Sequence, residues 1–257
     1  MVITDSKAAI ARHFSQAAAH YQQHAQLQRI SGQTLLAYAS SKSVALCLDL
    51  GCGSGQFLSA LTDNSEDVIG LDLSAAMLKQ SRMHRQSVKL LQGDAEQLPL
   101  QSGCVSRIFS NLALQWCGDL SAALSECYRV LQPSGQLLFS TLTCGTLDEL
   151  AQSFAQVDDH VHIRPFLTLA QIQRASQSSP WCTCQLTPQP VVLAYANGID
   201  VLRELKGFGA NYLHQRRPGL MTPRQLAVME HYYREHFSNA KGQLLASYQI
   251  IYGVLSK

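Results

Sequence analysis

The central part of the chain alternates short apolar runs with segments whose apolar residues recur at helical spacing. The sequence predicts five strands here, at 44–50, 67–73, 87–94, 104–111 and 136–142. Helical patterns begin near residues 56, 74 and 120, and Asp119 is suited to cap the last of them. This alternation predicts an α/β fold in which parallel strands are covered by helices on both faces.

The segments that flank this region carry more helices and two further strands. Residues 5–39 contain two helical patterns, and residues 146–176 read as helices rich in polar residues. We expect both segments to cover the strand ends as lids. Apolar runs at 189–196 and 244–255 predict two strands, with a helix at 200–208 between them.

Composition and charge exclude several classes of protein. The 257 residues are 46% hydrophobic and 15% charged, which is enough apolar material for a large core. A net charge of +2 argues against a nucleic-acid-binding face, and no apolar stretch approaches the ~20 residues of a membrane helix. The start of the chain lacks a signal-peptide pattern, and eight scattered cysteines without a CxxC pair indicate reduced thiols. We therefore expect a monomeric, cytoplasmic protein that binds neither membranes nor nucleic acid.

The stretch "LDLGCGSG" places a glycine-rich turn between the first predicted strand and its helix, where nucleotides bind in such folds. A triphosphate site requires a lysine after its last glycine, and none follows Gly55. A dinucleotide site requires GxGxxG, but after Gly51 and Gly53 the third glycine comes one position early, and Gln56 takes its place. The spacing therefore disfavours both phosphate-bearing ligands.

Acidic residues at three strand ends favour S-adenosylmethionine, which carries positive charge and no phosphate. Asp49 would repel a pyrophosphate, but it suits an ammonium and a sulfonium group. Asp72 ends the second strand and can accept hydrogen bonds from ribose hydroxyls. Asp94 follows the third strand and can accept a hydrogen bond from the adenine amino group, with the Ala95 amide facing a ring nitrogen.

The motifs "LDLGCGSG", "VIGLDLSAAML", "GDAEQLPL" and "ALSECYRVLQPSGQLLFST" together resemble the class I S-adenosylmethionine-dependent methyltransferases over residues 44–142. The resemblance implies a Rossmann-like, mostly parallel seven-stranded sheet with one reversed strand, for which 244–255 is the candidate. It implies a single domain over residues 1–257, with 44–142 as its cofactor-binding half and 189–257 completing the sheet. The expected cofactor contacts are Asp49, Gly51, Cys52, Gly53, Gly55, Asp72, Leu73, Met77, Asp94, Ala95, Asn111, Tyr21 and Gln28.

Four further segments narrow the resemblance. They are "FSQAAAHYQQHAQLQ", "SNLALQWCGDLSAAL", "LRELKGFGANYLHQRRPGLMTPRQL" and "TLTCGTLDEL", and they are similar to the malonyl-[acyl-carrier protein] O-methyltransferases of early biotin synthesis. That family implies methylation of the free carboxylate of a malonyl thioester on an acidic acyl carrier protein, which gives the methyl ester that primes pimeloyl synthesis. A carboxylate is ionised at pH 7 and needs no general base, so we assign no catalytic residue and expect the protein to align its substrates and exclude water.

A guanidinium suits the acceptor carboxylate because it can bind both oxygens at once. Arg203 is the first candidate, since the helix at 200–208 is expected over the strand ends. Arg164 is the second, with a solvated surface position as its alternative. Trp116 follows the fourth strand and is expected to line the acceptor site. Tyr21 is either a core residue of the first helix or an aromatic lid over the sulfonium.

Two groups of charged residues remain. The basic residues expected to receive the acidic carrier protein, unless they are simply solvated surface, are Lys206, Arg216, Arg217 and Arg224. His20 and His24, and "DDHVH" at 158–162, have metal-like spacing without a full ligand set, so we expect no metal.

Two other functions stay open on the sequence alone. A related methyltransferase acting on a quinone ring or another small carboxylic acid would need no basic cluster. A non-catalytic methyltransferase-like protein would show a degenerate glycine turn or a missing acidic strand end, and this chain has neither.

Overall fold

The computed structural model describes residues 7–17, 25–40, 42–84, 88–207 and 222–257. The strands are β1 (Val44–Leu50), β2 (Ser65–Asp72), β3 (Lys89–Gln92), β4 (Val105–Asn111), β5 (Leu131–Leu142), β6 (Thr183–Tyr195) and β7 (Leu244–Ser256). The helices in these ranges are α1 (Lys7–Ala17), α2 (Gln26–Ala37), α3 (Leu58–Thr62), α4 (Ala75–His84), the short 3-10 helix η2 (Leu114–Trp116), α5 (Leu120–Val130), α6 (Asp148–Phe154), α7 (Leu169–Ser176), α8 (Gly198–Gly207) and α9 (Pro223–His236). Among the described residues, no helix combines the length and hydropathy needed to cross a bilayer.

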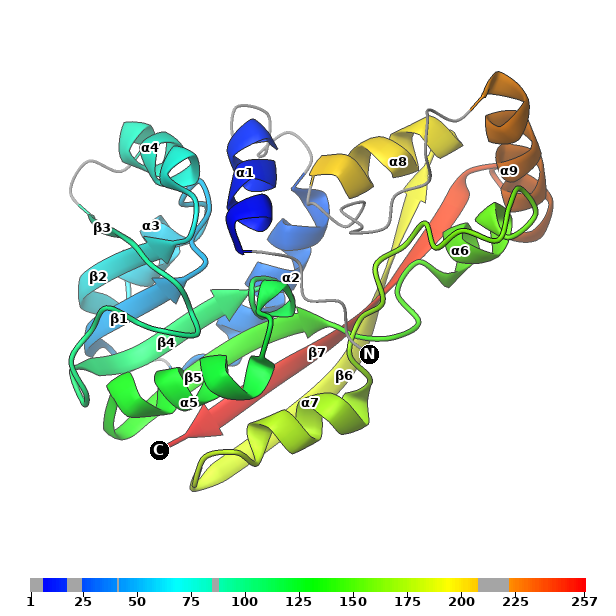
Figure 1. Ribbon diagram of the computed structural model, residues 1–257. Helices are drawn as coiled ribbons and strands as arrows, with labels where there is room; N and C mark the ends of the chain where they lie inside the picture. The colour runs from blue at the N-terminus through cyan, green and yellow to red at the C-terminus, as the bar shows by residue number, and fades with distance from the viewer. Residues whose placement is uncertain (1–6, 18–24, 41, 85–87, 208–221) are drawn as a thin grey trace.

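One seven-stranded sheet, in the order β3-β2-β1-β4-β5-β7-β6, runs through the molecule (Figure 1). Strands β1 to β5 pair in parallel, while β7 is antiparallel to both β5 and β6. The predicted fold class and the reversed strand near the C-terminus are therefore confirmed. The strand order reverses between β1 and β4, and the crevice at that point is where ligands bind in open α/β sheets.

Strands β5 and β6 begin well before the residues that the sequence predicts. Strand β5 already begins at Leu131, and β6 begins at Thr183 rather than at residue 189. Pro188 and Pro190 obscure the pattern of β6, because proline cannot donate to a ladder. They are tolerated because β6 lies at the edge of the sheet and pairs with β7 alone.

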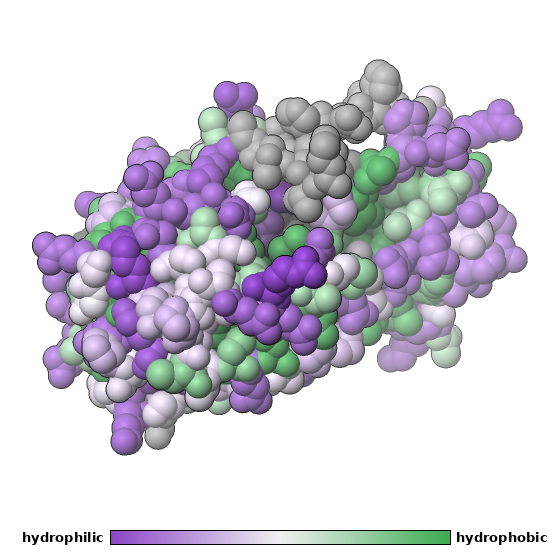
Figure 2. Space-filling model, turned by 60° about the horizontal axis from the view of Figure 1, so that its bottom comes forward, coloured by the Kyte–Doolittle hydropathy of each residue, from purple (hydrophilic) through white to green (hydrophobic). Residues whose placement is uncertain are grey.

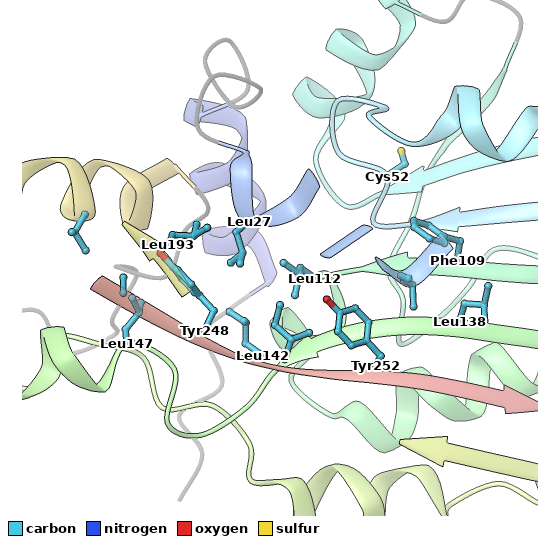
Figure 3. Close-up of a cluster of buried hydrophobic side chains, with 14 of the residues drawn as sticks. Leu27, Cys52, Phe109, Leu112, Leu138, Leu142, Leu147, Leu193, Tyr248 and Tyr252 are labelled. Atoms are coloured by element: carbon cyan, nitrogen blue, oxygen red, sulfur yellow. The ribbon is translucent and has the colours of Figure 1, made fainter. Parts of the chain in front are cut away.

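The sheet carries a hydrophobic core on each face. Phe109 and the inward residues of α2, α3, α6, α8 and α9 belong to one core, and Ile108 on the same strand belongs to the other, beneath α5 and α7. Figure 3 shows the first core, with Leu27 of α2 near Tyr248 of β7. Successive residues of a strand point to opposite faces, and the central strand β4 is buried on both of them.

The segment predicted as an inserted lid divides into parts with different roles. Helix α7 lies beside α5 on one face of the sheet, rather than over the strand ends, because Ile172 and Ala175 form an apolar stripe that is buried there. In Figure 2 the face of the molecule turned toward the viewer is mostly hydrophilic, with smaller apolar groups between. Helix α6 packs against β7 and α9. Only the loop between α6 and α7 reaches the candidate site described below.

Candidate functional site

The turn after β1 is built from glycines in the left-handed conformation. The φ angles of Gly51, Gly53 and Gly55 are 76°, 53° and 83°, values that glycine adopts without strain. The amide of Gly51 donates to the carbonyl oxygen of Leu71 at 2.7 Å, which ties the turn to the end of β2. A Cβ added to Gly51 would collide with the side chain of Ala113, so the space on this side of the turn is filled.

Two carboxylates lie beneath this turn. Asp72 accepts hydrogen bonds from the amides of Gly53 and Ser74 at 2.9 and 2.8 Å. Asp49 is 3% exposed, and its Oδ2 has no hydrogen-bond partner among the described residues. Burial, followed by the charge of Asp72, raises the pKa of Asp49 to about 8. Burial also raises the pKa of Asp72, although the amides of Ser74 and Gly53 work against it. The site therefore holds a buried and a half-buried acid that a cationic ligand would stabilise in their ionised form.

A pocket opens at the carboxyl ends of β1 to β4, and it encloses about 770 Å³ including its part open to solvent. The predicted cofactor residues that line it are Gly51, Gly53, Asp72, Leu73, Met77, Asp94, Ala95 and Asn111. Asp49, Cys52, Gly55 and Gln28 lie behind this wall, and Tyr21 lies outside the described residues.

Asn111 fastens α2 to the sheet at the back of the pocket. Its Nδ2 donates to the backbone oxygen of Gln28 at 2.9 Å, and its Oδ1 accepts from the hydroxyls of Ser31 and Ser140, both at 2.8 Å. Ser31 and Ser140 are fully buried. Gln28 is therefore linked to the pocket through its backbone, and its own side-chain Oε1 is buried without a partner in the described residues.

Helix α1 covers the pocket from the other side. Ile10 and Phe14 of this helix line the pocket, and Lys7 at its start forms ion pairs with Asp94 and with Glu96, the latter at 3.1 Å. Lys7 thus pairs with the carboxylate of Asp94, which the sequence assigns to the adenine amino group. No local pattern could reveal this contact, since Lys7 and Asp94 are 87 residues apart.

Trp116, which lines the pocket, is flanked by a second aromatic ring and by a cation. The ring of Trp116 meets that of Phe14 edge-on, with centroids 5.3 Å apart. Arg164, from the loop between α6 and α7, lies over the Trp116 ring, 5.0 Å from its centroid, and is 9% exposed. Three distant segments of the chain therefore meet at Trp116, which lines the pocket.

Arg203 lies elsewhere. Its side chain is 65% exposed and pairs with Asp200 on the same helix at 3.1 Å. The structure thus brings the second acceptor candidate, Arg164, next to the pocket, whereas the first is a solvated residue of α8. Of the basic cluster, Arg224 is exposed at the start of α9. Arg216, Arg217 and the side chain of Lys206 lie outside the described residues.

The "DDHVH" segment anchors the loop that carries Arg164. The Asp158 carboxylate is bonded to the His162 ring at 2.8 Å and accepts from the His160 amide at 3.0 Å. The hydrogen bond from His162 lowers the pKa of Asp158 to about 2. The His162 ring is stacked on Phe154 at 4.0 Å between centroids. Across the described residues, no three histidine, cysteine or acidic side chains converge as a metal site would need.

Comparison with known proteins adds a family to this geometry. A methyltransferase domain model matches residues 48–139. The malonyl-[acyl-carrier protein] O-methyltransferase of Serratia marcescens is 40% identical over 98% of this chain and 96% of its own length. The enzyme of the same name from Yersinia pestis is 42% identical over 97% of this chain and 91% of its own. Among solved structures, the YcgJ protein from Bacillus subtilis superposes with a TM-score of 0.64 at 18% identity, over 89% of this chain and 98% of that one, which establishes the shared fold.

Proposed function

Because the chain belongs to the malonyl-[acyl-carrier protein] O-methyltransferase family, we propose that it methylates the free carboxylate of a malonyl thioester on acyl carrier protein, with S-adenosylmethionine as methyl donor. The observation that carries the proposal is the polarity of one pocket. The buried Asp49 and the half-buried Asp72 lie beneath its glycine turn, and a guanidinium lies over the indole of Trp116 in its wall. Such a site suits a cationic donor and an anionic acceptor.

The residues present fit this donor. Asp49 lies behind the glycine turn, and its buried, unpartnered oxygen suits an ammonium group held at that turn. Asp72, which lines the pocket at the strand end, suits ribose hydroxyls. Asp94 and Ala95 line the part expected to hold adenine. When bound, S-adenosylmethionine supplies a methyl group on a positively charged sulfur.

The protein's own contribution is positioning and exclusion of water. The acceptor carboxylate is already ionised at neutral pH, so no side chain has to remove a proton. Arg164 supplies a planar guanidinium that can bind both carboxylate oxygens, and Trp116 fixes its orientation by stacking. Ile10 and Phe14 close the pocket with apolar surface. We assign no catalytic acid or base, and a metal has no part in the proposal.

Mass spectrometry of malonyl-acyl carrier protein incubated with enzyme and S-adenosylmethionine tests this function. The expected result is a gain of one methyl group on the malonyl form and none on the acetyl form, which lacks the free carboxylate. Methylation of small carboxylic acids or quinones, with none on the carrier protein, would favour the alternative substrate class.

Cationic residues near α8 and α9 are proposed to receive the acidic carrier protein. We expect Arg216→Glu combined with Arg217→Glu, and separately Arg224→Glu, to raise KM for malonyl-acyl carrier protein by about tenfold while cofactor affinity stays unchanged, because rim charges act on association. Initial rates over a range of salt concentrations measure this, with Arg174→Glu on exposed α7 surface as the control. A loss of cofactor affinity as large as the loss of affinity for the carrier protein would contradict the assignment.

Asp49 is expected to lower the stability of the free protein and to raise its affinity for the cofactor. With a pKa raised from 3.8 to about 8, the folded protein keeps a proton that the unfolded chain has lost, so stability falls with rising pH across that window and levels off above it. Asp49→Asn removes this titration, so the free protein should melt roughly 2–4 °C higher near neutral pH for each kcal/mol recovered.

The same substitution should weaken binding of the cationic cofactor. In the wild type, affinity should rise with pH up to about 8, as Asp49 ionises, and this rise should be reduced in Asp49→Asn. Calorimetric titrations and thermal melts across this pH range check both effects. A variant that binds as tightly as the wild type at every pH would exclude a role for Asp49 toward the cofactor.

The cytoplasmic location and the monomeric state expected from the sequence stay predictions. So does the absence of contacts with membranes and nucleic acid.

A further inference from the structure

A second cavity lies near the amino ends of β2 and β4, away from the glycine turn, between the end of α2 and the end of α3. It encloses about 770 Å³ including its open part, and no residue lines both it and the pocket at the glycine turn. Aliphatic side chains of Leu36, Leu61 and Leu138 form part of its wall. Its principal polar group is Arg107, from the first half of β4.

Arg107 is a buried guanidinium whose bonds are incomplete. It is 4% exposed, and its Nη2 donates to the backbone oxygens of Ser40 and Lys42, both at 3.3 Å. Its Nε is buried and has no acceptor in the part of the chain that the structure describes. Within those residues Arg107 forms no ion pair with a carboxylate either, and its hydrogen bonds go to backbone oxygens.

The physical chemistry of arginine makes this arrangement informative. A guanidinium does not lose its proton in proteins, so Arg107 cannot relieve its burial by becoming neutral. A buried charge without a partner is strongly unfavourable, and hydrogen bonds to an anion are about twice as strong as those to neutral acceptors. The two carbonyl contacts fasten the loop between α2 and β1 but use one terminal nitrogen only. The Nε–H therefore lacks an acceptor, and the Arg107 side chain lines a cavity large enough to contain one.

We propose that this cavity binds the carboxylate of a short aliphatic acid. Arg107 receives the carboxylate, and the leucine wall contacts the hydrocarbon chain, which distinguishes such a ligand from inorganic phosphate. Asp63 lines the same cavity as an exposed residue. Its negative charge repels an anion, so removal of this charge should strengthen anion binding, whereas removal of the Arg107 charge should weaken it.

Hexanoate binding to the full-length protein, followed by calorimetry and by thermal melting, tests the site. Wild-type protein should bind hexanoate saturably and melt at a higher temperature with it. Arg107→Gln should weaken binding at least about tenfold, as expected for loss of a charge-assisted pair. Asp63→Asn should strengthen binding by about two- to threefold, because a nearby like charge is removed. Arg174→Gln, an exposed arginine on α7, should leave it unchanged.

The outcomes separate the alternatives. Weaker binding in Arg107→Gln together with tighter binding in Asp63→Asn establishes the site even if Arg107→Gln is itself less stable, since Asp63→Asn leaves the guanidinium in place. Absence of saturable binding to the wild type, phosphate binding as tight as hexanoate, or equal hexanoate binding in Arg107→Gln and wild type would each overturn the proposal.

Discussion

Arg164→Gln is expected to lower kcat/KM for malonyl-acyl carrier protein by at least about 30-fold while leaving cofactor affinity within about twofold. With Arg164 as the proposed partner of the acceptor carboxylate, the substitution removes one member of a buried charge pair, which costs about 2–5 kcal/mol. Each 1.4 kcal/mol corresponds to a factor of about ten. Initial-rate kinetics and calorimetric titration of the cofactor measure the two quantities separately.

Two variants sharpen this test. Arg203→Gln removes an exposed guanidinium that pairs only with Asp200 among the contacts described, and it should change kcat/KM by less than about twofold. Arg164→Lys keeps the charge but loses the planar fork, so it should recover part of the activity. If Arg203→Gln lowered kcat/KM more than Arg164→Gln does, Arg203 would replace Arg164 as the acceptor residue.

Gly51→Ala is expected to reduce cofactor affinity by at least about tenfold. The new methyl group would collide with Ala113, and both residues line the pocket, so the glycine turn or the start of the segment after β4 must shift. The positive φ of 76° adds about 1–2 kcal/mol of strain for a residue with a Cβ. Equilibrium binding of S-adenosylmethionine measures the loss.

Gly103→Ala is the matched control. Gly103 also has a positive φ, 67°, but no atom lies within 4 Å of its added Cβ. This variant should lose about 1–2 kcal/mol of stability from backbone strain and keep its cofactor affinity. Unchanged affinity in both variants would mean that the close approach of Gly51 and Ala113 is unimportant for the cofactor.

The parts of the fold that the sequence predicted are those with local signals. Strand β1 was predicted with its observed ends because an apolar run stops at Gly51, and the helix at α5 because Asp119 caps it, accepting from the amides of Ser121 and Ala122. The assignment to the methyltransferase family is confirmed by relatives about 40% identical over nearly the whole chain. Spacing along the sequence sufficed here because each feature involves neighbours in the chain.

The remaining features depend on contacts between distant segments. Arg164 lies beside the pocket because its loop meets Trp116, and no pattern in the sequence places residues 48 positions apart beside one another. The contact of Lys7 with Asp94 could not be predicted for the same reason.

Helix α9 is different, since it has a local signal that the sequence prediction did not use. Thr222 and Gln225 form a capping box at its start.

The two N-terminal helices differ in how they are fastened, and this separates access to the pocket from its shape. Helix α2 is held by the fully buried hydroxyl of Ser31 on Asn111, a contact that dissolved salt does not screen. Helix α1 is held in part by Lys7, whose side chain is 43% exposed. Rising ionic strength should therefore loosen α1 first, so cofactor would enter and product leave faster while the back wall at Asn111 keeps its form.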